Sequence, residues 1–414
     1  MIRLPRFVVR IAVLSLAPLG AALGLQVPRN DRASVVGTAP SKPRVWPEPP
    51  DAPRIVLSGT LASERDIGKR LTGLAAFRAK VEGSKEVLVG VQRPFDVVVD
   101  AAQRVFVTDG GRNQVMVFDP ATHEAHPLGE SGPGRLASPV GLGIDDAGNI
   151  YVADRGSKRA VAFTPAGAFL RAYGNAELLL NPVDVAVDGK AGLVYVSDSF
   201  LHQVLVFRQS DGALLRRIGR SAGEVSASKR AAAAAPSTHG KAMRDAAEGP
   251  AAAGGPDAAT PGHGGKSRAE PRDVVLNRGT ADGEFRYPSF IAVSGAGELY
   301  VTDGLNSRVQ AFGRDGRFAR QVGKAGDGPG SFARPKGLAV DSEGHVYVVD
   351  AAFNNVQIFD DKARLLLFFG QMGQRDGEFD LPSGMFIDAS DRIYVADRAN
   401  NRVVVLQYLR ERAR

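Results

Sequence analysis

The sequence predicts an all-β fold, a six-bladed β-propeller, from three observations. A proline opens an apolar stretch six times, and a tetrapeptide similar to Tyr-Val-Ala-Asp ends 15 residues later in five copies and 16 in the third. An apolar residue lies nine positions after each aspartate. The period of about 45 residues has room for four short strands, which make one propeller blade. The prolines are Pro94, Pro139, Pro182, Pro288, Pro335 and Pro382; the aspartates are Asp109, Asp154, Asp198, Asp303, Asp350 and Asp397; the apolar residues are Phe118, Phe163, Phe207, Phe312, Phe359 and Leu406.

The fifth copy shows the four strands most plainly. Short runs rich in β-branched and aromatic residues, the types that strands favour, occur at 337–341, 346–350, 355–360 and 365–370. Residues 341–344, Asp-Ser-Glu-Gly, form a turn between the first two runs, where the glycine can adopt a positive φ. An apolar residue three positions before each opening proline is expected to pack one blade on the next. Six such units predict six blades.

The ring is expected to close through the N-terminal part of the chain. The sixth unit supplies three strands, at 385–388, 393–397 and 402–407, before a basic tail at 410–414. Residues 54–59, Arg-Ile-Val-Leu-Ser-Gly, match the fourth-strand pattern of residues 169–174. Pairing 54–59 with the last blade would cover an exposed strand edge, so the propeller is predicted to span 53–409.

The first 25 residues are typical of an export signal. Arg3, Arg6 and Arg10 precede an apolar run from 11 to 25 that ends in small residues. The protein is therefore expected to be exported, to the periplasm or the cell exterior, with an uncleaved inner-membrane anchor as the alternative. A proline-rich linker is expected at 26–52.

Two further segments depart from the period. Residues 220–278 carry scattered charges and almost no large apolar residue, which predicts a disordered insertion; a flexible lid is the alternative. Residues 62–82 carry apolar residues at spacings of three and four, which predicts an accessory helix capped by Ser63. Gly68 and Gly73 weaken that helix. Packing on the propeller is its main expected role, and docking to a partner or membrane is the alternative.

Composition limits the classes of function. The chain contains no cysteine, which excludes disulfides and thiolate zinc sites. The formal net charge is +7, for which simple solubility is the main explanation and binding of anionic partners is the alternative. For an exported chain these are polymers or headgroups of the cell envelope, so nucleic acid is not expected as a partner. Membrane contact is expected only through the N-terminal segment, if that segment is not cleaved.

The repeated aspartates are expected to be structural, because an aspartate at the end of a strand can accept backbone N–H groups and fix the following turn. Positions where the copies differ are better candidates for function. Asp96 and Asp184 replace a glycine that three copies carry after the proline, and the loops after the repeated aspartates add a mostly cationic rim, which includes Asn113. The predicted ligand-binding residues are Asp96, Asp184, Phe290, Lys336, Arg112, Arg155, Lys158, His202, Asn306, Asn354, Arg398 and Asn401.

Signals for catalysis are weak. The two histidines that lie close together, His123 and His126, fall in a turn, which is a poor zinc signal. No Gly-x-Ser-x-Gly element, P-loop or His-Glu-x-x-His motif occurs. We therefore assign no catalytic residue, no metal ligand and no cofactor from motifs. The alternative is a divalent cation in the central funnel.

The repeated unit resembles the NHL repeat. Its elements are Pro-x-Gly-apolar-Ala-Val-Asp, Tyr-Val-Ala-Asp and Asn-x-Arg-Val-x-x-Phe, found over 94–409 apart from the insertion and most closely matched at 303–309 and 397–403. The resemblance implies an NHL-type propeller, a fold that hosts RNA-binding and protein-binding modules, sensor domains of bacterial kinases and a metal-dependent lyase acting on peptidyl-hydroxyglycine. The histidine ligands of that lyase have no matching positions here.

Two hypotheses about function follow. The first is an exported, non-enzymatic binding or scaffold protein that recognises a peptide, protein or glycan of the bacterial envelope at the central funnel. The second is a metal-dependent lyase or lactone hydrolase with its site in the same funnel, in which Asp96, Asp184 and His202 surround a divalent cation.

Overall fold

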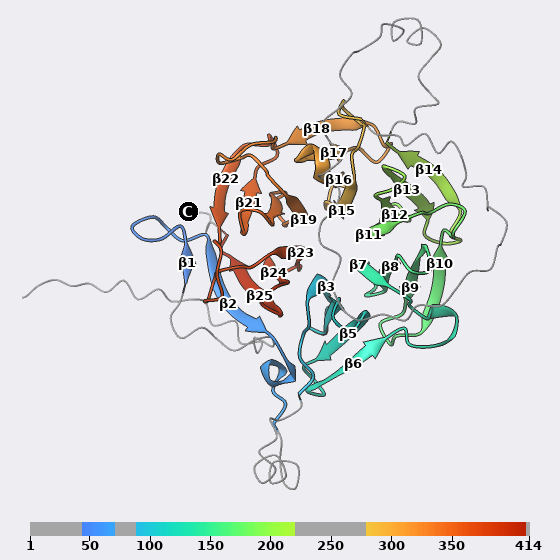
Figure 1. Cartoon of the computed structure of the whole chain (residues 1–414), viewed down its shortest axis with the longest axis horizontal. Coiled ribbons are helices and arrows are strands. Elements are labelled where there is room, and N and C mark those ends of the chain that lie inside the picture. Colours follow the sequence, from blue (N-terminus) through green and yellow to red (C-terminus); the bar gives the residue numbers. More distant parts are fainter. Residues whose placement is uncertain (1–43, 71–87, 220–278, 411–414) are drawn as a thin grey trace, which may run out of the picture. The chain divides into compact units, whose positions relative to one another are not determined.

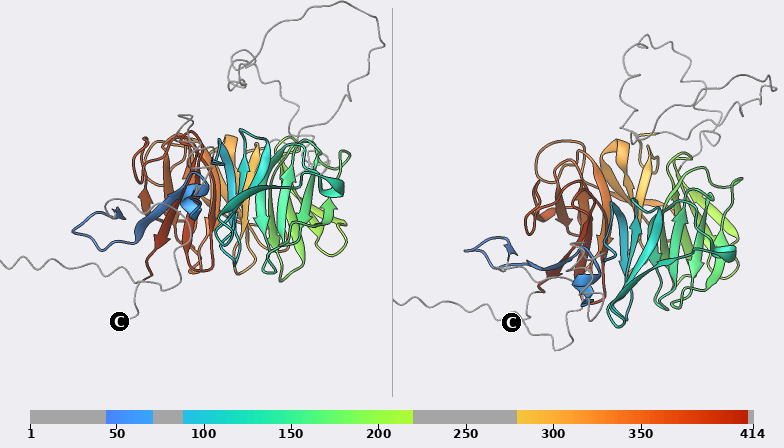
Figure 2. Two further views of the ribbon diagram at one scale, coloured as in Figure 1. Left: turned by 90° about the horizontal axis from the view of Figure 1, so that it is seen from below. Right: turned by 60° about the horizontal axis from the view of Figure 1, so that its bottom comes forward.

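The computed structural model describes residues 44–70, 88–219 and 279–410, all of which belong to one compact unit of the chain. Six antiparallel sheets stand around a common axis, as Figure 1 shows from one end of the ring and Figure 2 from its side. The predicted six-bladed propeller is therefore confirmed.

Blades 1 to 5 each have four strands in sequential order, and blade 6 has five, two of which come from the N-terminal part of the chain. Blade 1 contains β3 (Pro94–Val99), β4 (Val105–Asp109), β5 (Gln114–Asp119) and β6 (Glu124–Leu128). Blade 2 contains β7 (Pro139–Ile144), β8 (Ile150–Asp154), β9 (Arg159–Phe163) and β10 (Phe169–Tyr173). Blade 3 contains β11 (Pro182–Asp188), β12 (Leu193–Asp198), β13 (Gln203–Arg208) and β14 (Leu214–Ile218).

The second half of the ring repeats this arrangement. Blade 4 contains β15 (Pro288–Val293), β16 (Leu299–Asp303), β17 (Arg308–Phe312) and β18 (Phe318–Val322). Blade 5 contains β19 (Pro335–Val340), β20 (Val346–Asp350), β21 (Asn355–Phe359) and β22 (Leu365–Phe369). Blade 6 contains β23 (Pro382–Ile387), β24 (Arg392–Asp397), β25 (Arg402–Tyr408), β2 (Ile55–Leu61) and the short β1 (Val45–Trp46).

The hydrophobic core lies between neighbouring blades. Apolar clusters join side chains of adjacent sheets, as where Phe285 packs with Tyr195 and Val206 of blade 3 and with Phe312 of blade 4. Phe285, Phe332 and Phe379 all lie three residues before an opening proline and are completely buried. The wedge positions predicted from the sequence therefore pack one blade on the next, as expected for facing sheets.

The N-terminal strand closes the ring. β2 pairs antiparallel with β25, from Ile55 opposite Tyr408 to Leu61 opposite Val403. Ile55 and Leu57 enter the core between blades 5 and 6, where Trp46 of β1 also packs. The predicted closing strand, 54–59, is thus present and two residues longer at its C-terminal end. Residues 45 and 46, which the sequence assigned to the linker, instead form a fifth strand on this blade.

The described part of the segment expected to be a helix is one 3-10 turn, η1 (Glu64–Ile67). Ser63 caps its start, and Gly68, with a φ of 96°, ends it. Buried Glu64 accepts hydrogen bonds from the backbone N–H groups of Val89 and Ala125, which attaches the turn to blade 1. The remainder of that segment, the N-terminal residues 1–43 and the insertion 220–278 lie outside the described residues. Within the described ranges, no helix is long and apolar enough to cross a membrane.

Candidate functional site at the mouth of the central channel

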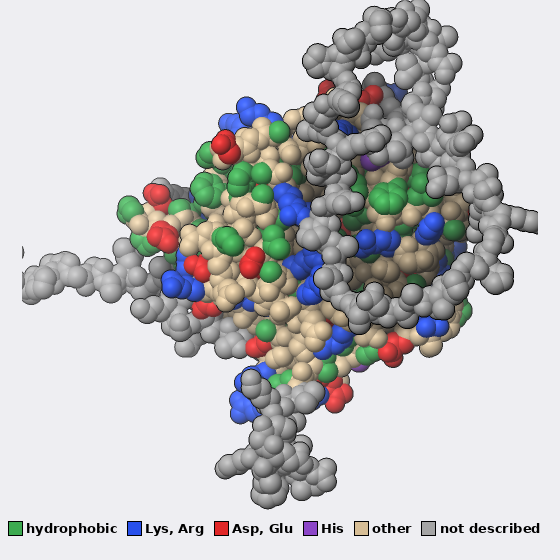
Figure 3. All heavy atoms as spheres, viewed as in Figure 1, with side chains coloured by type: hydrophobic (Ala, Val, Ile, Leu, Met, Phe, Trp, Pro, Cys, Tyr) green, Lys and Arg blue, Asp and Glu red, His purple; other side chains and the backbone are tan. Residues whose placement is uncertain are grey.

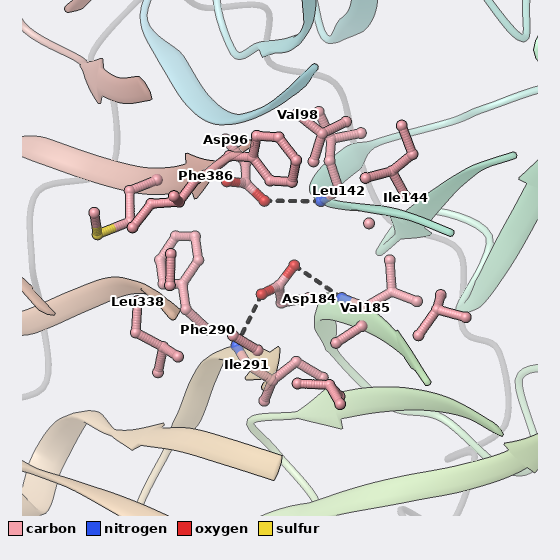
Figure 4. A pocket seen from close by; sticks show the side chains of 18 of the residues that line it. Asp96, Val98, Leu142, Ile144, Asp184, Val185, Phe290, Ile291, Leu338 and Phe386 are labelled. Carbon is pink, nitrogen blue, oxygen red and sulfur yellow. Dashed lines mark hydrogen bonds between the residues drawn. The ribbon is translucent and has the colours of Figure 1, made fainter. Parts of the chain in front are cut away.

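One end of the ring carries most of the predicted site residues. In every blade the opening proline pairs with the aspartate that ends the second strand, so the loops after these aspartates lie beside the start of the first strands. The six first strands surround a central cavity of about 140 Å³, part of which Figure 4 shows. We call the end of this channel beside the opening prolines the mouth.

The repeated aspartates are structural, as the sequence indicated. Asp198 is completely buried, and its carboxylate accepts backbone N–H groups of Leu180 and Asn181, which precede β11, and of Phe200 and Leu201 in the following loop. One side chain therefore joins the start of the first strand to the turn after the second.

Three of the predicted ligand-binding residues connect neighbouring blades instead. His202, Asn354 and Asn401 occupy the same loop position with φ values of 54°, 53° and 53°. His202 Nδ1 accepts a hydrogen bond from the backbone N–H of Tyr287 at 2.9 Å. Asn354 Oδ1 accepts one from the N–H of Leu381, and Asn401 Oδ1 accepts one from the N–H of Arg93, both at 2.8 Å. Each acceptor ties its blade to the opening of the next, which gives these residues a role in the ring itself.

The side chains of Arg112 and Asn306 also make hydrogen bonds within the fold. Arg112 donates to Asp109 Oδ2 and to the carbonyl of Gly90, both at 2.6 Å. Asn306 donates to Asp303 Oδ2 and to the carbonyl of Gly279, both at 2.8 Å. Asn400 makes the equivalent bonds in blade 6, which shows that this loop position supports the repeated aspartate.

Asp96 and Asp184 lie in the channel and are buried, and in Figure 4 their carboxylates face each other. Asp96 accepts the N–H of Val97 at 2.9 Å and that of Leu142 in blade 2 at 2.8 Å. Asp184 accepts the N–H of Val185 at 2.8 Å and that of Ile291 in blade 4 at 2.9 Å. Each carboxylate therefore bridges two first strands across a blade boundary.

Glycine at the same position of the preceding blade makes room for these carboxylates. A Cβ on Gly384 would lie 2.0 Å from Asp96 Oδ1, and one on Gly141 would lie 2.2 Å from Asp184 Oδ1. Both distances are far below a normal contact. The glycine-aspartate exchange that the sequence shows after the proline is therefore a packing pair between neighbouring blades.

Burial raises the pKa of both channel carboxylates. Desolvation raises the pKa of Asp96 to about 7, although the two N–H donors oppose the shift. Desolvation also raises the pKa of Asp184, and the negative charge of Asp96 raises it further. The pair therefore favours a state that holds a proton near neutral pH.

Stability is expected to decline between mildly acidic and mildly basic pH because of this pair. The pKa of Asp96 is about 7 in the folded protein and 3.8 ordinarily. The stability that Asp96 contributes is therefore complete below pH 3.8 and is lost as the pH rises through about 7. Wild type is expected to lose a few kcal/mol of stability between about pH 5 and about pH 8, and Asp96→Asn should reduce this loss, with Asp184 retaining a pKa raised by burial. Denaturant titrations of wild type and Asp96→Asn at both pH values measure the free energy of unfolding.

The control for this experiment is Asp146→Asn, which changes an exposed carboxylate in the first turn of blade 2. It should retain the wild-type pH dependence. An Asp96→Asn protein whose stability changes with pH as much as that of wild type would contradict the assignment.

Phe290 lines the cavity, where it packs against another aromatic ring. Its side chain is only 2% exposed, and its ring stacks on Phe95 at a centroid distance of 5.2 Å and an interplanar angle of 20°. The two residues belong to the first strands of blades 1 and 4, so the stack spans the channel. Phe290 therefore fills space that a ligand could otherwise enter.

A cluster of basic residues lies at the mouth. It consists of Lys336 and Arg398, both half-buried, and the exposed residues Arg93, Arg155 and Arg334. Burial and the charges of Arg334 and Arg398 lower the pKa of Lys336 to about 8. Burial and the charges of Arg93, Arg334 and Arg155 lower the pKa of Arg398, so these side chains are near neighbours.

The charge of this basic cluster is not compensated by the described part of the chain. None of its five side chains makes a hydrogen bond or ion pair with a described residue. Sequence reasoning found Arg155, Lys336 and Arg398 but missed Arg93 and Arg334. The signal for the missed pair was their position directly before an opening proline, where other blades carry Ser, Asn, Tyr or Leu. Lys158, also predicted, lies in the same loop as Arg155.

The residues expected around a divalent cation all make hydrogen bonds within the fold. The carboxylate oxygens of Asp96 and Asp184 already accept backbone N–H groups, and His202 uses Nδ1 between blades 3 and 4. Across the described ranges, no group of three or more His, Asp or Glu side chains is placed to hold a metal ion.

Comparisons with known families agree with this architecture. A family model described as a 6-bladed beta-propeller matches residues 279–354, and the NHL repeat model matches residues 379–406. The RING finger protein nhl-1 of Caenorhabditis elegans is 38% identical over 63 residues, which cover 15% of this chain and only 6% of that protein.

Several solved structures align with this chain at low sequence identity. An auxiliary nutrient binding protein from Bacteroides ovatus aligns with a TM-score of 0.51 at 11% identity, over 78% of this chain and 71% of that one. A gluconolactonase from Xanthomonas campestris aligns with a TM-score of 0.49 at 14% identity, over 85% of this chain and 98% of that one. A virginiamycin B lyase from Staphylococcus aureus aligns with a TM-score of 0.46 at 13% identity, over 77% of this chain and 96% of that one. At these identities the likeness concerns the fold alone.

Proposed function

We propose that this six-bladed propeller, in which residues 379–406 match the NHL repeat, acts as a binding protein that holds an anionic peptide, protein or glycan at the mouth of its channel. The observation that carries this proposal is the basic cluster, Arg93, Arg155, Arg334, Lys336 and Arg398. Like charges held close together and partly desolvated raise the free energy of the unbound protein. An anionic group at the mouth would relieve that repulsion.

The architecture supports a binding role in a second way. The loops that form the mouth are held between blades by the bonds of His202, Asn354 and Asn401. A site on such a rigid frame loses little conformational entropy when a ligand binds. We also propose that binding takes place outside the cytoplasm, because residues 1–25 have the sequence pattern of an export signal.

Charge reversal at the mouth tests the proposal. A fluorescent oligo-glutamate peptide serves as the probe, and its affinity is measured by fluorescence anisotropy at low ionic strength. We expect the double variant Arg155→Glu, Arg398→Glu to bind it at least about tenfold more weakly than wild type, because two attractive charges become repulsive. Binding to wild type should also weaken as salt is added.

The matched control is Arg317→Glu, which reverses an exposed charge in the turn between β17 and β18, away from the mouth. This control should bind like wild type. Equal affinity of wild type and the double variant would remove the basic cluster as the binding site.

The alternative, a metal-dependent lyase or lactone hydrolase, depends on the two channel carboxylates. Metal analysis of the purified full-length protein separates the two proposals. Stoichiometric metal that is lost from an Asp96→Ala, Asp184→Ala double variant would favour the enzyme. Protein that binds oligo-glutamate and carries no such metal would favour the binding protein.

A further inference from the structure

In the described part of the chain, the mouth also carries exposed apolar side chains, and all of them except Leu381 of blade 6 lie on blades 3 and 4. Two positions after the repeated aspartate, blades 3 and 4 carry Phe200 and Leu305, which are 52% and 63% exposed. The other four blades have only small residues at this position: Gly111, Gly156, Ala352 and Ala399. The repeat therefore does not require a large apolar residue at this position. The solvent exposure of Phe200 and Leu305 raises the free energy of the unbound protein.

Tyr287 joins these two residues into one surface. It is 36% exposed, its backbone N–H donates to His202 in the loop of Phe200, and its carbonyl accepts from Gly304, which precedes Leu305. We call Phe200, Tyr287 and Leu305 the apolar arc. The three residues lie next to one another along the boundary between blades 3 and 4.

The basic cluster occupies the remaining blades. Arg93 and Arg334 stand directly before an opening proline, the position that Tyr287 holds in blade 4. Arg155 and Arg398 directly follow a repeated aspartate in blades 2 and 6. Figure 3 shows basic side chains around the centre of the visible face, with apolar side chains beside them on the same face. The mouth is thus divided into a basic part, from blades 1, 2, 5 and 6, and the apolar arc.

We infer that the ligand is a peptide segment in which an aromatic or long aliphatic side chain lies next to acidic residues. This inference rests on the proposed binding function and specifies its ligand. The acidic residues would contact the basic cluster, while the apolar side chain would cover Phe200 and Leu305. Aromatic and apolar anchors of this kind supply much of the affinity in peptide recognition, whereas the charges supply orientation and a faster association.

The burial of the basic groups favours a peptide over a flat surface. Lys336 and Arg398 are half-buried among the first strands and loops of the mouth, whereas Phe200 and Leu305 stand out at its edge. A lipid bilayer would meet the apolar arc but not the recessed cations. A peptide side chain is narrow enough to reach them.

Three peptides of equal length and net charge test the inference by fluorescence anisotropy with the full-length protein. All are rich in glutamate, and the central residue is phenylalanine, leucine or serine. We expect wild type to bind the phenylalanine and leucine peptides about tenfold more tightly than the serine peptide. In the double variant Phe200→Ser, Leu305→Ser this preference should disappear, while the affinity for the serine peptide stays unchanged.

The matched control is Leu381→Ser, because Leu381 is exposed on the same face but belongs to blade 6, outside the apolar arc. This variant should keep the preference. Equal binding of all three peptides to wild type would overturn the inference while leaving the proposed function intact, whereas no binding of any would defeat both. Wild type could instead bind anionic phospholipid vesicles or a single-stranded oligonucleotide more tightly than any of the peptides. If that binding were lost in the Phe200→Ser, Leu305→Ser variant, the inference of a peptide ligand would also be overturned.

Discussion

Deletion of residues 44–61 is expected to lower the melting temperature of the protein by about 10 °C or more. The deletion removes β1 and β2, and with them the buried side chains of Trp46, Ile55, Leu57 and Leu61. Each contributes roughly 2 kcal/mol by burial. The deletion also leaves β25 as an unpaired edge, so we expect the variant to aggregate on heating. Differential scanning calorimetry and light scattering measure the two effects.

Two further measurements identify the cause. A synthetic peptide of residues 44–61 should raise the melting temperature of the deleted protein when added in excess, because it can pair with β25 in the same register. Leu57→Asp should destabilise the full chain, whereas Glu48→Gln, at an exposed position of the same segment, should not. An unchanged midpoint after the deletion would show that the ring does not depend on this closure.

The second large effect is expected from Asp350→Ala. Asp350 is completely buried, and its carboxylate accepts the backbone N–H groups of Ala333, Arg334, Ala352 and Phe353. The alanine variant leaves these donors without their acceptor in a partly buried place. We expect a loss of about 4 kcal/mol in the free energy of unfolding, measured by denaturant titration.

Asp361→Ala is the control, since Asp361 is an exposed aspartate in an outer turn of the same blade. It should change stability by less than about 0.5 kcal/mol. A similarly small effect of Asp350→Ala would mean that water replaces the carboxylate without cost, and the structural role of the six aspartates would have to be abandoned.

The candidate site could be predicted only in part. Arg155, Lys336 and Arg398 were found because the copies of the repeat differ at their positions, and the structure places them at the mouth without an ion-pair partner among the described residues. The same criterion also selected Asn354 and Asn401, which turn out to hold blades together. Variation between copies cannot separate these cases, because a contact between blades depends on both of the partners that meet there.

Position in the repeat did predict which residues share an end of the ring. It could not predict the direction of side chains within that end. Phe290 was expected to bind ligand, yet it stacks on Phe95 across the channel. Asp96 and Asp184 were expected to face the funnel, and they do, but each uses its oxygens to bridge first strands.

By itself the sequence determined the frame of this protein: six four-stranded blades, the apolar wedges between them, the aspartates that secure their turns and the strand that closes the ring. These features follow from local patterns that recur at a fixed spacing. Only the tertiary structure decided which polar residues are free to bind. That depends on distances between blades far apart in the chain. Within the described residues, His202 Nδ1 accepts a backbone N–H of the next blade, whereas the side chains of Arg155 and Arg398 have no hydrogen-bond partner.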